Sequence, residues 1–137
     1  MSGSRITYAR VFTDSTGETH FDDVEIDLCP VVLAPPAPPL DLSPFTPVAR
    51  YAFCAFSAGW GGDWHSAPRR QFFLILSGEL EFEVSDGEVR RFGEGGMVML
   101  EDTAGKGHIA RNVGEEAVHT VVVQLPVRKP NAIFVQR

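Results

Sequence analysis

The sequence predicts an all-β fold, and three observations support that class. Short apolar segments of strand length recur along the chain, with glycine-containing turns between them. One proline-rich stretch, at residues 30–47, interrupts the series. No stretch keeps a helical period for longer than a turn or two. Short strands at this spacing are typical of a β-sandwich or barrel, here with an N-terminal hairpin and a proline-rich strap.

Composition and charge limit the class of protein. The 137 residues are 44% hydrophobic and include ten Phe, which is enough for one domain with a sizeable core. The formal net charge is −6, from 12 basic and 18 acidic side chains. Nucleic-acid binding relies on clustered Lys and Arg, so we expect no nucleic-acid partner.

The cellular compartment is inferred from the cysteines and the apolar runs. No run approaches the roughly 20 apolar residues that span a bilayer, and the N-terminus lacks the apolar region of a secretory leader. Cys54 lies in an apolar strand and is expected to be a buried thiol, while Cys29 precedes a proline. We therefore expect a soluble, cytoplasmic protein with reduced thiols and no membrane partner.

Residues 1–28 are expected to form an N-terminal β-hairpin. Strands are predicted over 6–13 and 20–28, and the turn between them contains Gly17. In the second strand the acidic residues Asp23, Glu25 and Asp27 alternate, which predicts a face in contact with water. His20, close to two aspartates, is expected to be exposed.

Residues 29–47 are expected to form the strap. Seven of the ten prolines lie between residues 30 and 47, and they remove backbone donors and fix φ. This segment therefore cannot be a central strand. Its apolar residues predict that it lies on the barrel or on a neighbouring subunit.

Residues 48–126 are expected to form the barrel core, followed by a C-terminal tail over 127–137. Segment 71–76 is apolar on both faces, as expected inside packed layers, and Asp86-Gly87 predicts a hairpin turn. The predicted strands cover 48–57, 71–76, 79–84, 89–92, 97–101, 108–113 and 117–125.

Two histidines and a glutamine recur at fixed distances among glycines. The first series is Gly59, five residues, His65, one residue, Ala67, three residues, Gln71, six residues, Gly78. The second is Gly105, two residues, His108, three residues, Asn112. Together they resemble the two motifs of the cupin superfamily, over about 54 residues. The resemblance implies a cupin-type jelly-roll, or Greek-key, β-barrel as a single domain over 1–137.

The resemblance also implies metal ligands, but this chain departs from the pattern. The ligand positions are His65, position 67, Gln71 and His108. Ala67 has no donor atom, and Gln71 stands where the family usually has Glu. We expect His65, Gln71 and His108 to bind a divalent Fe, Mn, Ni or Zn ion, with water or a carboxylate such as Glu101, Asp102 or Asp63 completing the shell. The alternative is two imidazoles hydrogen-bonded to Gln71, backbone or water, without metal.

Two function classes remain open from the sequence. The first is a metal-dependent enzyme acting on a small organic molecule, by the dioxygenase, isomerase or decarboxylase chemistry that the resemblance allows. The second is a non-catalytic module that binds a small molecule without metal. No catalytic residue is assigned.

Four further residues are candidate ligand-binding residues. Trp60 and Trp64 flank glycines before His65 and are suited to wall a cavity, or to seal the barrel or a dimer contact. Arg69 shares a strand face with Gln71, so its guanidinium is suited to bind a carboxylate, or else it faces solvent. Glu101, near Lys106, is suited to acid–base work or to an ion pair. Because cupins often pair through N-terminal strands, we also expect a homodimer.

Overall fold

The computed structural model describes residues 4–128, and within them every regular element is a strand. None of these residues belongs to a helix long and apolar enough to cross a membrane. The strands are β1 (Arg5–Thr13), β2 (Thr19–Asp27), β3 (Cys29–Val31), β4 (Leu40–Leu42), β5 (Arg50–Phe56), β6 (Gln71–Ser77), β7 (Leu80–Val84), β8 (Val89–Phe92), β9 (Met97–Leu100), β10 (His108–Asn112) and β11 (Val118–Gln124). The all-β prediction is confirmed, and the expected strands of the hairpin and barrel agree with these to within two residues.

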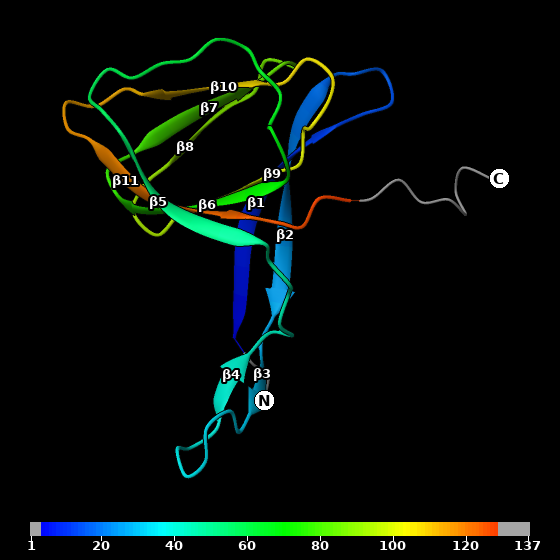
Figure 1. Ribbon diagram of the computed structural model, residues 1–137, viewed down its shortest axis with the longest axis vertical. Coiled ribbons are helices and arrows are strands. Elements are labelled where there is room, and N and C mark those ends of the chain that lie inside the picture. Colours follow the sequence, from blue (N-terminus) through cyan, green and yellow to red (C-terminus); the bar gives the residue numbers. More distant parts are fainter. Residues whose placement is uncertain (1–3, 129–137) are drawn as a thin grey trace, which may run out of the picture.

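Two sheets face each other across the core (Figure 1). The larger sheet has the order β2-β1-β9-β6-β11-β5, and the smaller one has the order β10-β7-β8. All neighbouring strands are antiparallel except β1 and β9. The two sheets are hydrogen-bonded separately, so the barrel is open rather than closed.

Alternation along the strands builds the core between these sheets. On β6 the inward residues Gln71, Phe73 and Ile75 are buried, and on β7 the side chains of Leu80, Phe82 and Val84 are almost fully buried. Burying such side chains contributes about 1.5–3 kcal/mol each, so the alternating pattern fixes which face of each strand points inward.

The loop between β5 and β6 covers the free edge of β10. Gly61 forms a bridge with Arg111, and His65 forms one with His108. The loop therefore acts as an extra edge strand, and it carries His65 to the smaller sheet.

The strap forms a small sheet of its own, separate from the two sheets of the barrel. Strands β3 and β4 pair with each other in a two-stranded sheet that projects away from the barrel (Figure 1). Its base is tied by the Leu28 N–H, which donates to the Ser4 carbonyl, and by the Ser4 hydroxyl, which donates to Asp41. The strap does not lie on the barrel of its own chain, so only the neighbouring-subunit alternative remains a prediction. Most of the expected tail, 129–137, lies outside the described residues.

Candidate functional site

His65 and His108 lie side by side. The His65 N–H donates to the His108 carbonyl at 3.1 Å, and the His108 N–H donates to the His65 carbonyl at 2.9 Å. This backbone pairing places the two ring centroids 4.6 Å apart. His108 is only 2% exposed and packs against Phe82, whereas His65 is exposed. The structure thus brings together two residues that are 43 positions apart.

Gly107 makes this pairing possible. Its φ is +77°, a conformation that residues with a side chain rarely adopt. A Cβ at this position would also collide with the His65 carbonyl. The glycine directly before His108, which is not one of the glycines of the motif, therefore lets the two backbones approach.

Both imidazoles are held through Nδ1. His108 Nδ1 lies 2.6 Å from Asp102 Oδ2, and His65 Nδ1 donates to the Asp63 carbonyl at 2.8 Å. Asp102 is fully buried, and its Oδ1 has no hydrogen-bond partner among the described residues. No hydrogen bond joins Nε2 of either ring to any residue in 4–128. This arrangement orients both rings and leaves both Nε2 atoms available.

Gln71 is turned toward a different residue. Its side-chain Oε1 accepts a hydrogen bond of 2.8 Å from Nε2 of Gln124, which lies directly opposite on β11. Gln71 is buried and faces inward, as the alternation predicts. Its amide oxygen is thus bound within the larger sheet rather than to either imidazole.

Gln124 is the centre of a polar cluster at the open end of the barrel. Arg50 Nε donates to Gln124 Oε1 at 2.6 Å, and the Arg69 guanidinium reaches the same atom at 3.4 Å. Arg50, Val122 and Gln124 line a cavity of about 310 Å³, which we name the inner pocket. Arg50 and Ala52 share the strand face of Phe56, and Val122 and Gln124 share that of Val118, so the pocket lies on the inward face of the sheet. The expectation that Arg69 and Gln71 share a side of the sheet agrees with this geometry.

The tryptophans differ in their contacts. The Trp60 ring packs edge-on against Phe56, with centroids 4.9 Å apart, and it lies close to Gly62, next to the His65 ring. Trp60 therefore covers the core beside the histidine pair. Trp64 is half exposed, and neither tryptophan lines the inner pocket.

Comparison with known proteins identifies the family. The sequence model of the cupin domain matches residues 52–124, more than half of this chain. The chain is a cupin. No curated protein matches it.

Several solved structures resemble this cupin. A conserved protein of unknown function from Streptococcus pyogenes is 26% identical, with a TM-score of 0.45, and the match covers 57% of this chain and 65% of that one. A cupin 2 conserved barrel domain protein from Salinispora arenicola is 19% identical, with a TM-score of 0.47 and coverage of 74% and 76%. The cupin domain of Cnp3 from Schizosaccharomyces pombe is 13% identical, with a TM-score of 0.49 and coverage of 97% and 88%.

The donor atoms of this cupin do not fit the metal that its family implies. Position 67 is a buried alanine, and the Gln71 amide is bound to Gln124. Asp102, weighed above as a completing ligand, instead holds His108 through Nδ1. No group of three or more His, Cys, Asp or Glu within residues 4–128 is arranged to hold a metal ion. Two imidazoles without a carboxylate leave the charge of a divalent ion uncompensated.

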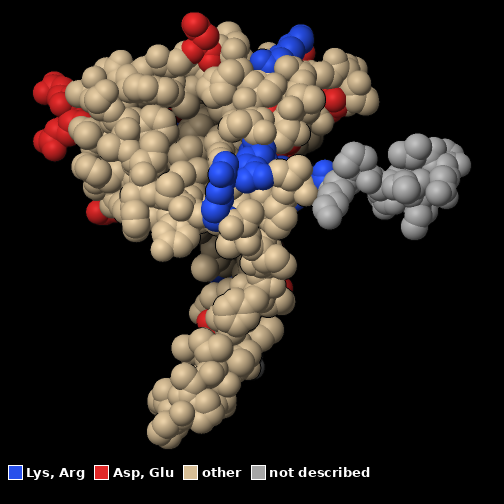
Figure 2. Space-filling model, in the orientation of Figure 1, with Lys and Arg blue, Asp and Glu red and all other residues tan. Residues whose placement is uncertain are grey.

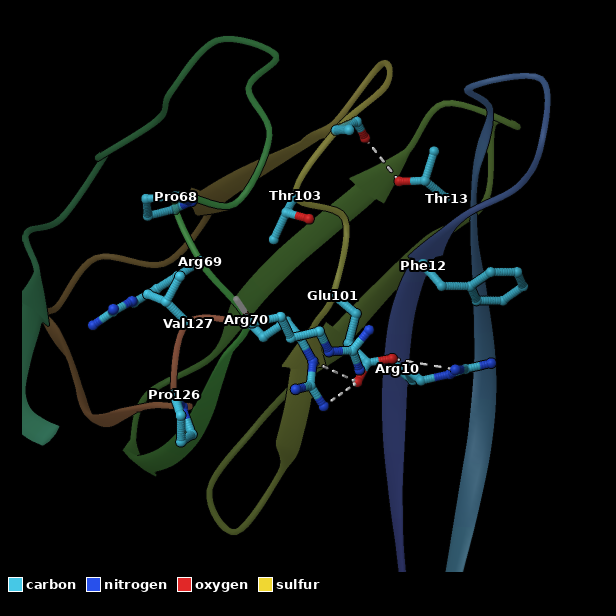
Figure 3. Close-up of a pocket in the computed structure, with 12 residues that line it drawn as sticks. Arg10, Phe12, Thr13, Pro68, Arg69, Arg70, Glu101, Thr103, Pro126 and Val127 are labelled. Carbon is cyan, nitrogen blue, oxygen red and sulfur yellow. Dashed lines mark hydrogen bonds and ion pairs between the residues drawn. The ribbon is translucent and has the colours of Figure 1, made fainter. Parts of the chain in front are cut away.

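Glu101 points away from the histidine pair. It accepts from Arg10 at 3.2 Å and from Arg70 at 3.1 Å, on the outer side of the larger sheet (Figure 3). The hydrogen bond to Asp22 is the main cause that raises the pKa of Arg10 above its ordinary value, and Glu101 adds to it. Glu101 and Arg69 both line a cavity of about 580 Å³, named here the rim pocket, which segments 68–70, 101–104 and 126–128 enclose together with β1.

Sequence reasoning missed Gln124 and Arg50. Both lie at the ends of predicted strands, and alternation from Val118 places Gln124 on the inward face. Alternation in the strand that begins at Val48 would likewise have placed Arg50 inward. That signal was in the sequence, but the pairing of Gln124 with Gln71 depends on strand order, which the sequence pattern does not contain.

Proposed function

We propose that this cupin is a non-catalytic module that binds a small organic anion in the inner pocket without a metal. One observation carries the proposal. Arg50 and Arg69 converge on a single neutral acceptor, Gln124 Oε1, and no carboxylate of residues 4–128 lies within 4 Å of either guanidinium. Arg50 lines the inner pocket, and Arg69 reaches the same acceptor from the side of the rim pocket. Two uncompensated guanidinium groups around one neutral acceptor favour a ligand that carries the missing negative charge.

The dimensions of the pocket suit a small ligand. A volume of about 310 Å³ lies at the lower end of the range for small-molecule sites. Ala52 and Val122 supply an apolar wall, and the Arg50 guanidinium supplies donors in a planar fork that matches a carboxylate. The Arg69 guanidinium reaches the same Gln124 oxygen from outside this lining. Charge-assisted hydrogen bonds of this kind contribute about 1.5–3 kcal/mol each.

A metal-dependent enzyme is the second candidate function. The observation that favours it is the orientation of His65 and His108, whose Nδ1 atoms are held by oxygen acceptors while no described residue contacts Nε2. Metal-ligating histidines are commonly oriented in this way. The missing carboxylate and third imidazole count against this candidate.

A combined metal and binding measurement separates the two. Untagged protein, purified without added metal, is analysed for bound elements and then titrated calorimetrically with benzoate and pyruvate, with benzamide as the neutral control. We expect saturable binding of at least one of these anions, no binding of benzamide, and metal at background. Arg50→Gln and Arg69→Gln should weaken binding about tenfold, whereas Arg91→Gln, on the outer face of β8, should not.

Two results would contradict the binding proposal. Near-stoichiometric metal that disappears in His65→Ala and in His108→Ala would favour the enzyme instead. Anion binding that is absent, or that is unchanged in Arg50→Gln, would remove the role assigned to the inner pocket.

We also propose that the protein is a cytoplasmic homodimer. The two cysteines are free thiols, which suits a reducing compartment. Two apolar surfaces on the same chain support the dimer. Phe45 in the strap is 77% exposed, and Phe53 on the outer face of the larger sheet is 75% exposed. Because the strap projects away from its own barrel, a second copy related by a two-fold axis can cover both surfaces at once.

Sedimentation measurements test this assembly. The wild-type chain should sediment as a dimer at micromolar concentration, and Phe45→Ser and Phe53→Ser should shift it toward monomer. Val89→Ser, an exposed position on β8, is the matched control. A wild-type chain that remains monomeric at about 100 μM would refute the dimer.

A further inference from the structure

The rim pocket is larger than the inner pocket and shares no lining residue with it. Its volume is about 580 Å³, and Phe12, Pro68 and Val127 give it apolar walls (Figure 3). Arg69 and Arg70 are neighbours in the chain but point in opposite directions (Figure 3). Arg69 reaches Gln124, toward the inner pocket, and Arg70 reaches Glu101 in the rim pocket. Arg69 thus lines the rim pocket while its guanidinium reaches Gln124, so the segment 68–70 lies between the two cavities.

The charge of the rim pocket is opposite to that of the whole chain. Its lining includes four guanidinium groups and one carboxylate, a formal charge of +3, in a protein with a net charge of −6. Figure 2 shows basic side chains near the centre of one face of the molecule, with most acidic side chains toward its edges. The basic lining residues are Arg10, Arg69, Arg70 and Arg128.

These guanidinium groups are not equally compensated. Arg10 is bound by two oxygens of Asp22 in addition to Glu101. Arg70 has Glu101 alone, and it must share that carboxylate with Arg10. Arg128 forms no ion pair with a carboxylate of the described residues. Arg70 and Arg128 also line an adjoining cavity of about 370 Å³, so both are accessible from two sides.

We propose that the rim pocket binds a small dianion, a phosphate or a dicarboxylate, on Arg70 and Arg128, with Glu101 as an internal competitor. The partly buried Arg70–Glu101–Arg10 chain holds the Arg70 guanidinium in place before a ligand arrives, so less freedom is lost on binding. An incoming dianion takes the donors of Arg70 that Glu101 leaves open and adds those of Arg128. Its second charge matches the excess positive charge of the lining.

Because Glu101 competes with the ligand for Arg70, the proposal predicts the direction in which each substitution changes the affinity for a dianion. Removing the Glu101 charge leaves the guanidinium groups with one less compensating carboxylate, so a bound dianion should be held more tightly. Removing a guanidinium should have the opposite effect. A diffuse attraction to basic surface would respond equally to the loss of any arginine.

The experiment is a calorimetric titration of the full chain with inorganic phosphate and, separately, with malonate. We expect Arg70→Gln and Arg128→Gln each to weaken binding about fivefold and Glu101→Gln to tighten it about threefold. Arg5→Gln, at the far end of β1 beside Glu25 and Asp27, is the control that changes net charge equally, and it should leave affinity unchanged. Binding of phosphate alone or of malonate alone identifies which dianion the pocket accepts, and thermal unfolding of each variant verifies that it is folded.

Three outcomes would overturn the proposal: binding of neither anion, equal weakening by Arg5→Gln and Arg70→Gln, or no tightening in Glu101→Gln. Arg50→Gln separates this site from the inner pocket. If Arg50→Gln abolishes phosphate binding and Arg70→Gln does not, the rim pocket is refuted while the inner pocket remains. If only Arg70→Gln and Arg128→Gln matter, the rim pocket stands whatever the inner pocket binds.

Discussion

The two sheets contribute unequal halves to the region where the cupin motifs meet. On the side of the smaller sheet, His65 and His108 are paired through their backbones and oriented by oxygen acceptors at Nδ1. On the side of the larger sheet, Gln71 is bound to Gln124, and the guanidinium groups of Arg50 and Arg69 reach the Gln124 amide oxygen. The histidine half, His65 and His108, presents two oriented imidazoles, and the glutamine half, Gln71 and Gln124, is surrounded by the guanidinium groups on which the proposed anion site rests.

This contrast shows that the backbone geometry of the motif does not require the usual ligand set of the family. Gly107 and the pairing of His65 with His108 are required for the loop to cover the edge of β10, with or without a metal. The side chains at positions 67 and 71 do not have that structural duty. The fold therefore constrains the histidine half through its backbone, whereas the side chains of the glutamine half take no part in this edge pairing.

The largest expected effect comes from Gly107→Ala, which attacks the histidine half directly. The new Cβ would collide with the His65 carbonyl, in a backbone conformation with φ of +77° that disfavours a side chain. We expect a loss of about 4 kcal/mol in the free energy of unfolding, measured by denaturant titration. Gly87→Ala is the matched control, because its φ is +100° but no atom lies near its Cβ, and it should lose only about 1 kcal/mol. Equal losses would mean that the contact with His65 is unimportant.

A smaller effect is expected when the glutamine half is restored. The double change Ala67→His and Gln71→Glu replaces the missing imidazole and carboxylate, and should raise affinity for Zn²⁺ about a hundredfold, or about 2.7 kcal/mol. Competition with a chromophoric chelator measures the gain. Adding His65→Ala to the double variant should remove it. If the double variant gains nothing, positions 67 and 71 do not correspond to the family's ligand positions.

Asp102→Asn tests the anchoring of His108 with a slightly smaller expected effect. Asp102 is fully buried, and the substitution replaces one carboxylate oxygen by an amide NH₂ for which no acceptor is at hand. We expect a loss of about 2 kcal/mol in unfolding free energy. Asp63→Asn is the control, because Asp63 contacts His65 through its backbone carbonyl alone. A neutral result for Asp102→Asn would show that the carboxylate does not stabilise the pair.

The fold was largely predictable from the sequence, because strand alternation is a local property. Phe82 and Val84, for example, point into the core, as their alternation with glutamates predicts. The resemblance to the family likewise predicted that His65 and His108 would be close, since it assigns both to one set of ligand positions. The glycine that permits their backbone approach, Gly107, lies outside the motif.

The polar contacts were less predictable, because they depend on strand order and on the direction in which each side chain leaves the backbone. Glu101 and Asp102 are adjacent, yet one joins Arg70 outside the sheet and the other His108 in the core. The strap was expected to lie on the barrel or on a neighbouring subunit. Because β3 pairs with β4, the strap forms backbone hydrogen bonds within itself and projects away from the barrel of its own chain. Cys54 is only partly buried because β5 lies at the edge of its sheet.

His20 is held between two aspartates, Asp14 and Asp86, and we call these three residues the clamp. The clamp takes no part in the histidine half or the glutamine half. Expected to be exposed, His20 is instead half-buried between Asp14, at 2.7 Å from Nε2, and Asp86, at 2.8 Å from Nδ1. These hydrogen bonds, that to Asp14 foremost, raise the pKa of His20 above 6.5. Hydrogen bonds from Thr16 and then His20 lower the pKa of Asp14, and those from the Glu88 N–H and His20 lower the pKa of Asp86, each from 3.8.

This clamp predicts the smallest effect, and its sign follows from the pKa shifts. The stabilisation by His20 is fully present below pH 6.5 and is lost as the pH rises through its higher folded-state pKa. The stabilisation by Asp14 and Asp86 is present above pH 3.8 and is lost as the pH falls through their lower values. The difference in Tm between wild type and His20→Asn should therefore be a few degrees near pH 5–6 and shrink at both higher and lower pH. Thermal scans from pH 3 to 9 test this, with His119→Asn, on the exposed outer face, as the control. A difference that does not vary with pH would mean that the charge on His20 does not hold the clamp together.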